Sequence, residues 1–490
     1  MDAAPTMLAA VVAVLAGVVA LLPMLRRRLS GVAPADKRTD PFPLPPGSIG
    51  PPIVGHTLSF VRALRANTAE EWLRRRVAMY GPVSRLSLFR CPTAFVVGAA
   101  ANKFLFGSAD LAPKTTESLS RMIGRRSIRH VVGDEHRRVR AMVVQFLRLD
   151  AEVRRHLDAE WCGRSTVSVM PSMKSLTFDI MCTVIFRLDR GEDAAVRREL
   201  SAEFQQLASG VTALPVNLPF TTFGKCLAAS RRGRGAVTGV IQERRARLER
   251  GESSPADDVI THMLAEGLPD HEEHHRQRHV PHDRGARHHR RPPHLPPPAP
   301  RRQRGRLRQS CPEQEDVARG KAPGEALSWE DLGRMRYTWA AAMETLRMVP
   351  PVFNTVRRAL RDVEFGGYLI PRGWQVLHAA SMTHLDPAIF PEPGRFDPAR
   401  FESSSPAAAA AATTTIPPFS FVPFGGGVRV CPGNEFARVE TLVAVHYIVT
   451  RFKWKLAAGC DGSFSRFPLP YPSQGLLIDI QPRQRLEMNA

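Results

Sequence analysis

The sequence Phe421-Val-Pro-Phe-Gly-Gly-Gly-Val-Arg-Val-Cys-Pro-Gly433 decides how the rest of the chain is interpreted. It joins three consecutive glycines to one cysteine, Cys431, and a helical pattern follows over residues 434–450. Glycines let a backbone approach another group closely. Arg429 and the positive end of the following helix favour a thiolate over a thiol at the cysteine. A phosphate-binding loop is excluded because no Lys-Ser or Lys-Thr pair follows the glycines, and a buried core cysteine is the plain alternative.

The pattern in this loop is Phe-x-x-Gly-x-Arg-x-Cys-x-Gly, and its fixed positions are filled by Phe424, Gly427, Arg429, Cys431 and Gly433. Five fixed positions within ten residues argue against chance. The loop resembles the heme-binding loop of cytochrome P450 monooxygenases. The resemblance implies that the chain carries heme b (iron protoporphyrin IX) and that the Cys431 thiolate ligates the heme iron. In that family the thiolate pushes electron density toward O–O cleavage.

The composition describes a globular chain in a reducing compartment. The 490 residues are 43% hydrophobic, which is enough for a sizeable core. The seven cysteines lack the paired spacing of a disulfide framework or a zinc ribbon. Of the formal charge of +21, residues 271–310 contribute +8, with 11 Arg against 3 acidic residues. The remaining charge is spread widely, which is typical of solvated surface, and no nucleic-acid partner is expected.

The N-terminal segment predicts a membrane anchor. Residues 7–25 are apolar and uncharged, long enough to cross a bilayer, and three arginines follow at once. The arginines should stay on the cytosolic side of the membrane, which places the N-terminus on the lumenal side. No convincing small-residue cleavage site precedes the arginines, so a cleaved signal peptide is not favoured. We therefore expect an anchor over 1–30, a basic and proline-rich hinge over 31–52 and a catalytic domain over 53–490. The resemblance implies a single-pass protein of the endoplasmic reticulum membrane with a cytosolic catalytic domain.

Three further basic residues are candidates for binding the heme propionates. His136 and Arg140 are four residues apart and share one face of a predicted helix. A solvated basic face is the plain alternative, but the resemblance implies propionate binding, as in the plant branch that uses His at this position. Arg357 lies where the family places another propionate-binding arginine, alongside Arg429. A surface arginine is the alternative for Arg357.

A second pair of motifs predicts a structural triad. Glu344 and Arg347 are three residues apart on a predicted helix, where an ion pair is natural. Alone, such a pair is commonly a surface bridge worth under about 1 kcal/mol. The segment Phe396-Asp-Pro-Ala-Arg-Phe401 follows about fifty residues later. The resemblance implies that Glu344, Arg347 and Arg400 form a buried triad that locks the core around the heme, although Ala399 replaces the usual Glu.

The other patterns predict a mainly α fold with a small β-region. Apolar residues recur at helical spacing in residues 68–80, 151–265 and 328–347, the last opening with a capping box at Ser328. Alternating patterns predict a β-hairpin from residues 83–88 and 94–97 and further strands within 352–376. The resemblance implies that these elements form the cytochrome P450 fold, preceded by the N-terminal transmembrane helix.

Residues 271–312 depart from the family. The family has a long distal helix there, with Ala/Gly-Gly-x-Asp-Thr-Thr relaying protons to bound oxygen. Residues 271–310 instead contain 8 His, 11 Arg and 7 Pro, and the prolines forbid a long helix. The literal interpretation is a His-rich metal-binding tract or a disordered basic loop. However, shifting the codons of residues 279–289 by one nucleotide permits an apolar stretch ending in Ala-Ala-His-Asp-Thr-Thr. We therefore hypothesise that about 271–312 is frame-shifted and that the frame recovers by residues 313–316.

Two functions remain open at this point. The first is a heme-thiolate monooxygenase that inserts one oxygen atom from O2 into a C–H bond of a hydrophobic isoprenoid, whether triterpenoid, diterpenoid or sterol. Its electrons would come from NADPH-cytochrome P450 reductase, because the chain has no convincing nucleotide-binding fingerprint of its own. The alternative is a catalytically inactive product of a frame-shifted gene that lacks the oxygen-activating distal helix. The expected partners are the reductase, a hydrophobic small molecule and the membrane.

Overall fold

The computed structural model describes residues 41–51, 54–113, 121, 149–184, 186–210, 216–254, 259–265, 310–322, 324–402, 416–431, 433–465 and 470–483. The expected membrane anchor, His136, Arg140 and residues 271–309 of the anomalous tract lie outside these ranges. Within the ranges, no helix combines the length and the apolar character needed to cross a membrane.

The chain divides into two compact units, each assembled from separate stretches of sequence. Unit 1 comprises Met1–Lys114, Arg347–Gly394 and Ile416–Val430. Unit 2 comprises Thr115–Leu346, Arg395–Thr415 and Cys431–Ala490. One crossing from unit 2 to unit 1 falls within helix α14 (Arg336–Met348), and the last return to unit 2 falls between Val430 and Cys431.

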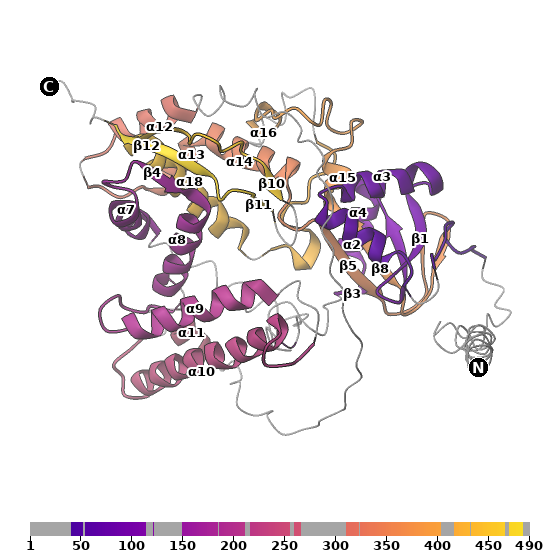
Figure 1. Ribbon diagram of the computed structural model, residues 1–490, viewed down its shortest axis with the longest axis horizontal. Coiled ribbons are helices and arrows are strands. Elements are labelled where there is room, and N and C mark those ends of the chain that lie inside the picture. Colours follow the sequence, from indigo (N-terminus) through magenta and orange to yellow (C-terminus); the bar gives the residue numbers. More distant parts are fainter. Residues whose placement is uncertain are drawn as a thin grey trace, which may run out of the picture. The chain divides into compact units, whose positions relative to one another are not determined.

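A five-stranded sheet in the order β1-β2-β8-β5-β3 forms the centre of unit 1 (Figure 1). Its strands are β1 (Val83–Leu88), β2 (Cys91–Val96), β3 (Leu111–Pro113), β5 (Asn354–Ala359) and β8 (Gln375–Ala379). The antiparallel β1–β2 pair confirms the predicted hairpin, with Val83 opposite Val96. Its two turn residues, Phe89 and Arg90, have φ of 51° and 63°, as a two-residue hairpin turn requires.

Both faces of this sheet are covered, which explains why every residue of β8 is buried. The described residues of unit 1 include the helices α2 (Thr57–Arg65), α3 (Ala69–Tyr80), α4 (Ala99–Gly107) and α15 (Ala380–His384). Phe60 of α2 and Leu73 of α3 pack against Leu377 on one face. Leu105 of α4 packs with Val376 on the other face. A short hairpin, β6 (Val363–Phe365) and β7 (Tyr368–Ile370), turns at two glycines.

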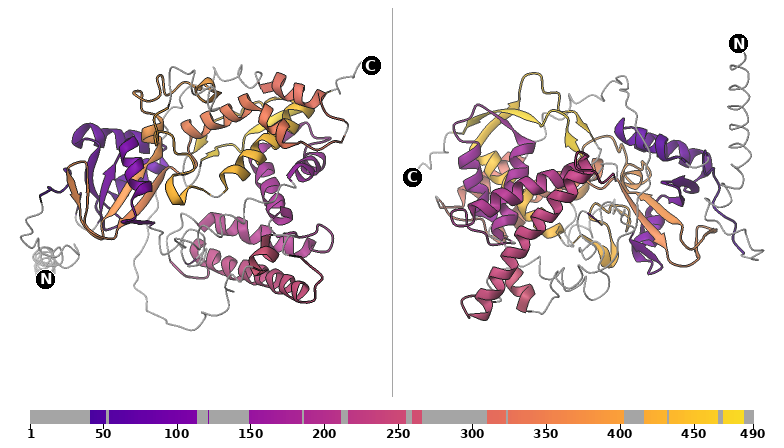
Figure 2. Two further views of the ribbon diagram at one scale, coloured as in Figure 1. Left: turned by 180° about the vertical axis from the view of Figure 1, so that it is seen from behind. Right: turned by 60° about the horizontal axis from the view of Figure 1, so that its bottom comes forward.

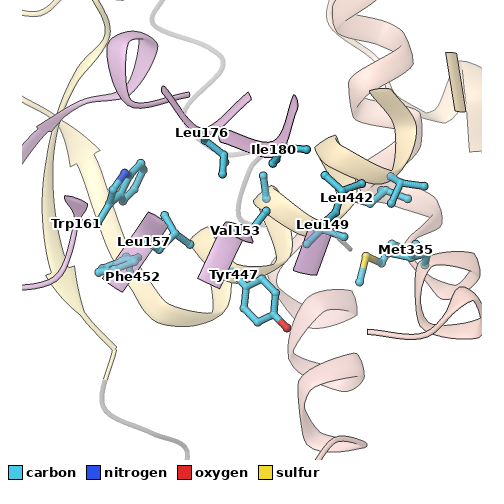
Figure 3. Packing of buried hydrophobic residues seen from close by; sticks show 14 of the residues in the cluster. Leu149, Val153, Leu157, Trp161, Leu176, Ile180, Met335, Leu442, Tyr447 and Phe452 are labelled. Carbon is cyan, nitrogen blue, oxygen red and sulfur yellow. The ribbon is translucent and has the colours of Figure 1, made fainter. Parts of the chain in front are cut away.

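Helix α18 (Asn434–Arg451) lies in the main core of unit 2, and it matches the helical pattern that follows Cys431. The helices α7 (Leu149–Glu160), α8 (Val169–Val184), α12 (Ser310–Arg319) and α13 (Trp329–Arg334) contribute to the same core. Figure 3 shows Leu442 of α18 among Leu149, Val153 and Ile180. The core therefore joins the helix after the cysteine to segments almost three hundred residues upstream.

The remaining elements of unit 2 are a second helical layer and short strands. Helices α9 (Ala194–Gly210) and α10 (Thr222–Glu249) pack along each other, with α11 (Val259–Ala265) against α10 (Figure 2). One small sheet has the order β4-β12-β9, and β10 and β11 form another. These strands and the last short helix are β4 (Thr166–Ser168), β9 (Phe452–Leu456), β10 (Phe464–Ser465), β11 (Tyr471–Pro472), β12 (Leu477–Pro482) and α16 (Ala399–Glu402).

The sequence predicted one continuous helix from Ser328 to Arg347. This prediction was wrong, because the structure has two helices there. The capping box at Ser328 is confirmed, because its hydroxyl accepts from the Asp331 amide and the Asp331 carboxylate accepts from the Ser328 amide. Helix α13 nevertheless ends at Arg334, and α14 starts again at Arg336. The Glu313 carboxylate of α12 accepts from the Tyr337 amide at 2.7 Å, so a tertiary cap begins the second helix.

A buried polar network connects α12, α14 and α18. Thr338 donates to Glu313 at 2.9 Å, and the Gln314 amide donates to Thr338 at 2.7 Å. His446 of α18 lies 2.8 Å from the Gln314 side-chain oxygen through its Nδ1 atom. Burial lowers the pKa of His446 to about 4, so the ring is neutral near pH 7.

This pKa predicts acid sensitivity. The unfolded chain protonates His446 below about pH 6.5, whereas the folded chain, in which burial lowers the pKa to about 4, does so only near that pH. Because the unfolded state binds more protons in this window, stability falls as the pH falls, by about 3 kcal/mol at most from this residue. Urea unfolding between pH 7 and 5 should show a shallower loss in His446→Gln than in the wild type. Equal slopes of unfolding free energy against pH in the two proteins would contradict the low pKa of His446.

Candidate functional site

The cysteine loop is built from two tight turns that precede α18. The Gly425 amide donates to the Val422 carbonyl at 3.0 Å, and the Val430 amide donates to the Gly427 carbonyl at 3.1 Å. A single 3-10 turn, η3 (Gly427–Arg429), closes the second. Cys431 follows directly, half-buried, three residues before α18 begins at Asn434. Phe424 is also half-buried.

The loop glycines that belong to unit 1 pack against Phe106 of α4. A Cβ atom at Gly427 would come 2.2 Å from the Phe106 carbonyl oxygen, and one at Gly426 would come 3.3 Å from the Phe106 ring. Gly427 also has a φ of +64°, which side chains rarely adopt. Only glycine fits at this point of the loop. Gly433 of unit 2 differs, since its Cβ would make an ordinary 3.9 Å contact with the Cys431 sulfur.

Arg357 and Arg429 form a pair of cations without a carboxylate partner among the described residues. Arg357 lies on β5 opposite Val376 and is buried. Burial lowers the pKa of both arginines, and the positive charge of Arg429 lowers the pKa of Arg357 further. In the described part of the chain, Nε of Arg357 and Nη2 of Arg429 are buried and have no hydrogen-bond partner.

Arg357 is buried and Arg429 is half-buried, so these two neighbouring guanidinium groups favour a bound anion, because unpaired charge removed from water is costly. The propionates of heme b are anions of the right kind, and arginine binds carboxylates through paired hydrogen bonds. The arginine pair, the sterically required glycine and the adjacent cysteine therefore fit a heme. His136 and Arg140, the other two candidate propionate ligands, lie outside the described residues.

The three residues of the expected triad have the following contacts within their units. In unit 2, Glu344 is fully buried and lies 3.6 Å from Nε of Arg400, and its carboxylate accepts from the Asp397 amide at 2.9 Å. In unit 1, Arg347 is fully buried and donates to the carbonyls of His384 and Pro393, each at 2.8 Å. Its guanidinium also lies over the Phe390 ring, 5.3 Å from the centroid.

Sequence patterns did not identify Phe106, Asn102 or His384 as neighbours of the cysteine loop. The Asn102 amide donates to the Phe419 carbonyl at 2.6 Å, and the Val422 amide donates to Nε2 of His384 at 3.0 Å. These contacts reach backbone groups more than thirty residues away in sequence. No local spacing rule could have found them, because a backbone partner leaves no residue pattern.

Comparisons with known proteins identify the family of this chain. The family model described as Cytochrome P450 matches residues 311–471. Cytochrome P450 716A1 of Arabidopsis thaliana is 32% identical, covering 94% of this chain and 96% of the relative. A beta-amyrin 28-monooxygenase of Panax ginseng is 33% identical, covering 90% and 93%. A taxane 10-beta-hydroxylase of Taxus cuspidata is 31% identical, covering 90% of each protein.

Among solved structures, the retinoic acid-bound cyanobacterial CYP120A1 is 25% identical, with a TM-score of 0.67 over 90% of this chain and 100% of that one. The chain belongs to the cytochrome P450 family and is, by homology, a monooxygenase. The expected P450 fold and the resemblance to plant enzymes that oxidise triterpenoids and diterpenoids are both confirmed.

The two loop glycines should respond differently to substitution. Gly427→Ala should abolish heme retention, because its methyl group meets a backbone carbonyl and its φ is unfavourable. Gly433→Ala should retain heme, since the added methyl makes an ordinary contact. The heme-to-protein absorbance ratio of the purified variants measures this. Equal heme content in the two variants would show that the Phe106 contact does not constrain the loop.

The buried carboxylate of Glu344 should contribute more to the free energy of unfolding than an exposed carboxylate does. Glu344→Ala should cost about 3–5 kcal/mol in unfolding free energy, since it removes the buried carboxylate that lies 3.6 Å from Nε of Arg400 and accepts the Asp397 amide. Glu71→Ala removes the acid of an exposed pair with Arg75 and should cost under about 1 kcal/mol. Urea unfolding of both variants compares them, and a similar loss in the two would contradict the buried role.

Proposed function

We propose that this chain is a membrane-anchored heme-thiolate monooxygenase that inserts one oxygen atom from O2 into a C–H bond of a hydrophobic isoprenoid. The observation that carries the proposal is the unpartnered pair Arg357 and Arg429 beside a glycine loop that ends at Cys431. A triterpenoid or diterpenoid substrate is favoured over a sterol by the relatives, which are named beta-amyrin monooxygenases and a taxane hydroxylase.

Each site residue has a defined task in this proposal. Cys431 would hold the heme iron, and Arg357, Arg429, His136 and Arg140 would bind the propionates. Phe424, Gly427 and Gly433 would shape the loop so that the backbone lies close to the cofactor. When bound, the heme supplies the oxygen-activating chemistry. Glu344, Arg347 and Arg400 would act structurally, by fixing the segments that carry the binding residues.

The proposal includes a partner, a location and a domain order. NADPH-cytochrome P450 reductase would deliver the electrons. Residues 1–30 would anchor the chain in the endoplasmic reticulum membrane, residues 31–52 would form the hinge, and residues 53–490 would form the cytosolic catalytic domain. The large share of apolar residues in 7–25 supports the anchor.

The frame-shift hypothesis for about 271–312 belongs to the same proposal. Two observations support a recovered frame by residue 313. The match to the Cytochrome P450 family model begins at residue 311. Glu313 and Gln314 then take part at once in the buried network with Thr338 and His446. Upstream, the Arg, His and Pro composition of 271–310 offers no acid–alcohol pair for relaying protons.

Carbon monoxide difference spectra test this function. The full chain is expressed in two forms, as given and with the frame of 271–312 corrected. The corrected form should show a thiolate-type band, and Cys431→Ser should abolish it. With reductase and NADPH, the corrected chain should oxidise triterpenoid or taxane scaffolds. The chain as given should bind heme without turnover. Turnover by the chain as given would refute the inactive-product alternative, and absence of the band from both forms would refute heme-thiolate function.

Sequencing the transcript across the codons for residues 265–321 tests the frame directly. One extra or missing base that restores the Asp-Thr-Thr helix would identify the chain as a faulty translation of a working enzyme. A transcript that matches the sequence as given would favour the inactive product.

A further inference from the structure

Two buried side chains bind the segment Phe419–Val422, which leads into the cysteine loop. From α4, the Asn102 amide donates to the Phe419 carbonyl at 2.6 Å. From the C-terminal end of α15, His384 accepts the Val422 amide at Nε2, at 3.0 Å. Both side chains are fully buried, and they come from separate elements of unit 1. The segment is therefore fixed from two sides, three residues apart.

The segment needs such contacts because its backbone is strained. Phe419 has a φ of +64°, in the left-handed region that bulky residues seldom adopt. A conformation of this kind persists only where the surroundings impose it. The Asn102 bond to the Phe419 carbonyl supplies that constraint. The His384 ring adds a second one, because it packs against the Phe421 ring at a centroid distance of 5.1 Å.

Further hydrogen bonds connect these residues to the loop and to Arg347. Arg347 donates to the His384 carbonyl at 2.8 Å, so the buried arginine fixes the residue that binds Val422. The Val422 carbonyl in turn accepts the Gly425 amide, which closes the first turn of the loop. One helical turn after Asn102, Phe106 supports the loop glycines. Helix α4 thus contacts the loop at its entry and at its glycines.

We propose that Asn102 and His384 are positioning residues that set the path of the loop into Cys431, a role that rests on the proposed heme-thiolate function. Asn102 acts on the Phe419 carbonyl, and His384 acts on the Val422 amide. Since a ring nitrogen accepts only when unprotonated, His384 must be neutral with its proton on Nδ1. Burial agrees with this, as it lowers the pKa of His384 to about 3.

The alternative is that these are ordinary buried polar groups whose loss weakens the whole fold. Thr93→Val is the matched control, because Thr93 is also fully buried in unit 1 and bonds Gln375 and the Cys91 carbonyl instead of the loop. His384→Gln keeps an acceptor for the Val422 amide, whereas His384→Leu removes it. Asn102→Ala removes the donor to Phe419.

The experiment is hydrogen–deuterium exchange of the full chain, followed in peptides that cover residues 416–430. Exchange in these peptides should rise about tenfold in Asn102→Ala and His384→Leu, the scale of one lost buried hydrogen bond. It should stay near the wild-type rate in His384→Gln and Thr93→Val. Unchanged exchange in the first two variants, or an equal rise in Thr93→Val, would overturn the proposal.

A second readout connects the loop to the cysteine. In the carbon monoxide spectrum, Asn102→Ala and His384→Leu should lose at least half of the thiolate-type band, on the order expected for the same loss of one buried hydrogen bond. A full band in variants whose loop exchanges faster would overturn the positioning role. If the wild type shows no thiolate-type band, the proposed function fails, and the exchange pattern still decides whether the two side chains fix the segment.

Discussion

Burial of the Arg347 guanidinium is the constraint on which unit 1 depends. A charged group removed from water must receive acceptors with good geometry, or it destabilises the fold. Arg347 is fully buried and obtains two carbonyl acceptors, from His384 and Pro393. Those carbonyls come from the chain after β8, so that segment must wrap around the end of α14. The cysteine loop is then attached to the same segment through His384 and Val422.

A second constraint, which is steric, determines the conformation of the glycine loop. Helix α4 presents the Phe106 carbonyl and ring to the loop, and no side chain fits at Gly427. The loop therefore lies flat on α4 and directs Arg429 toward the neighbourhood of Arg357, whose pKa senses its charge. One helix and one strand of unit 1 thus contribute the Phe106 contact and the Arg357 charge to the stretch immediately before the cysteine.

The ten-residue loop pattern was enough to indicate the family, because its fixed residues are local in sequence. The resemblance in turn implied that Glu344 lies near Arg400, and the two are 3.6 Å apart. The sequence could not predict the break at Met335, because the carboxylate that starts α14 belongs to Glu313 on another helix. The sequence left a surface arginine open as the alternative for Arg357, and the sheet shows that this residue is buried. Asn102 and His384 bind backbone atoms and leave no pattern.

The contacts that shape the cysteine loop do not involve the anomalous tract. Among the described residues, the side chains that contact the loop and its entry within unit 1 come from α4 and α15, and both helices lie outside residues 271–312. The network that starts α14 begins only at Glu313. The residues that shape the loop and the residues of the tract therefore lie in different stretches of sequence. An alteration confined to 271–312 leaves every loop contact described above in place, because those contacts come from residues 102–106, 384 and 419–430.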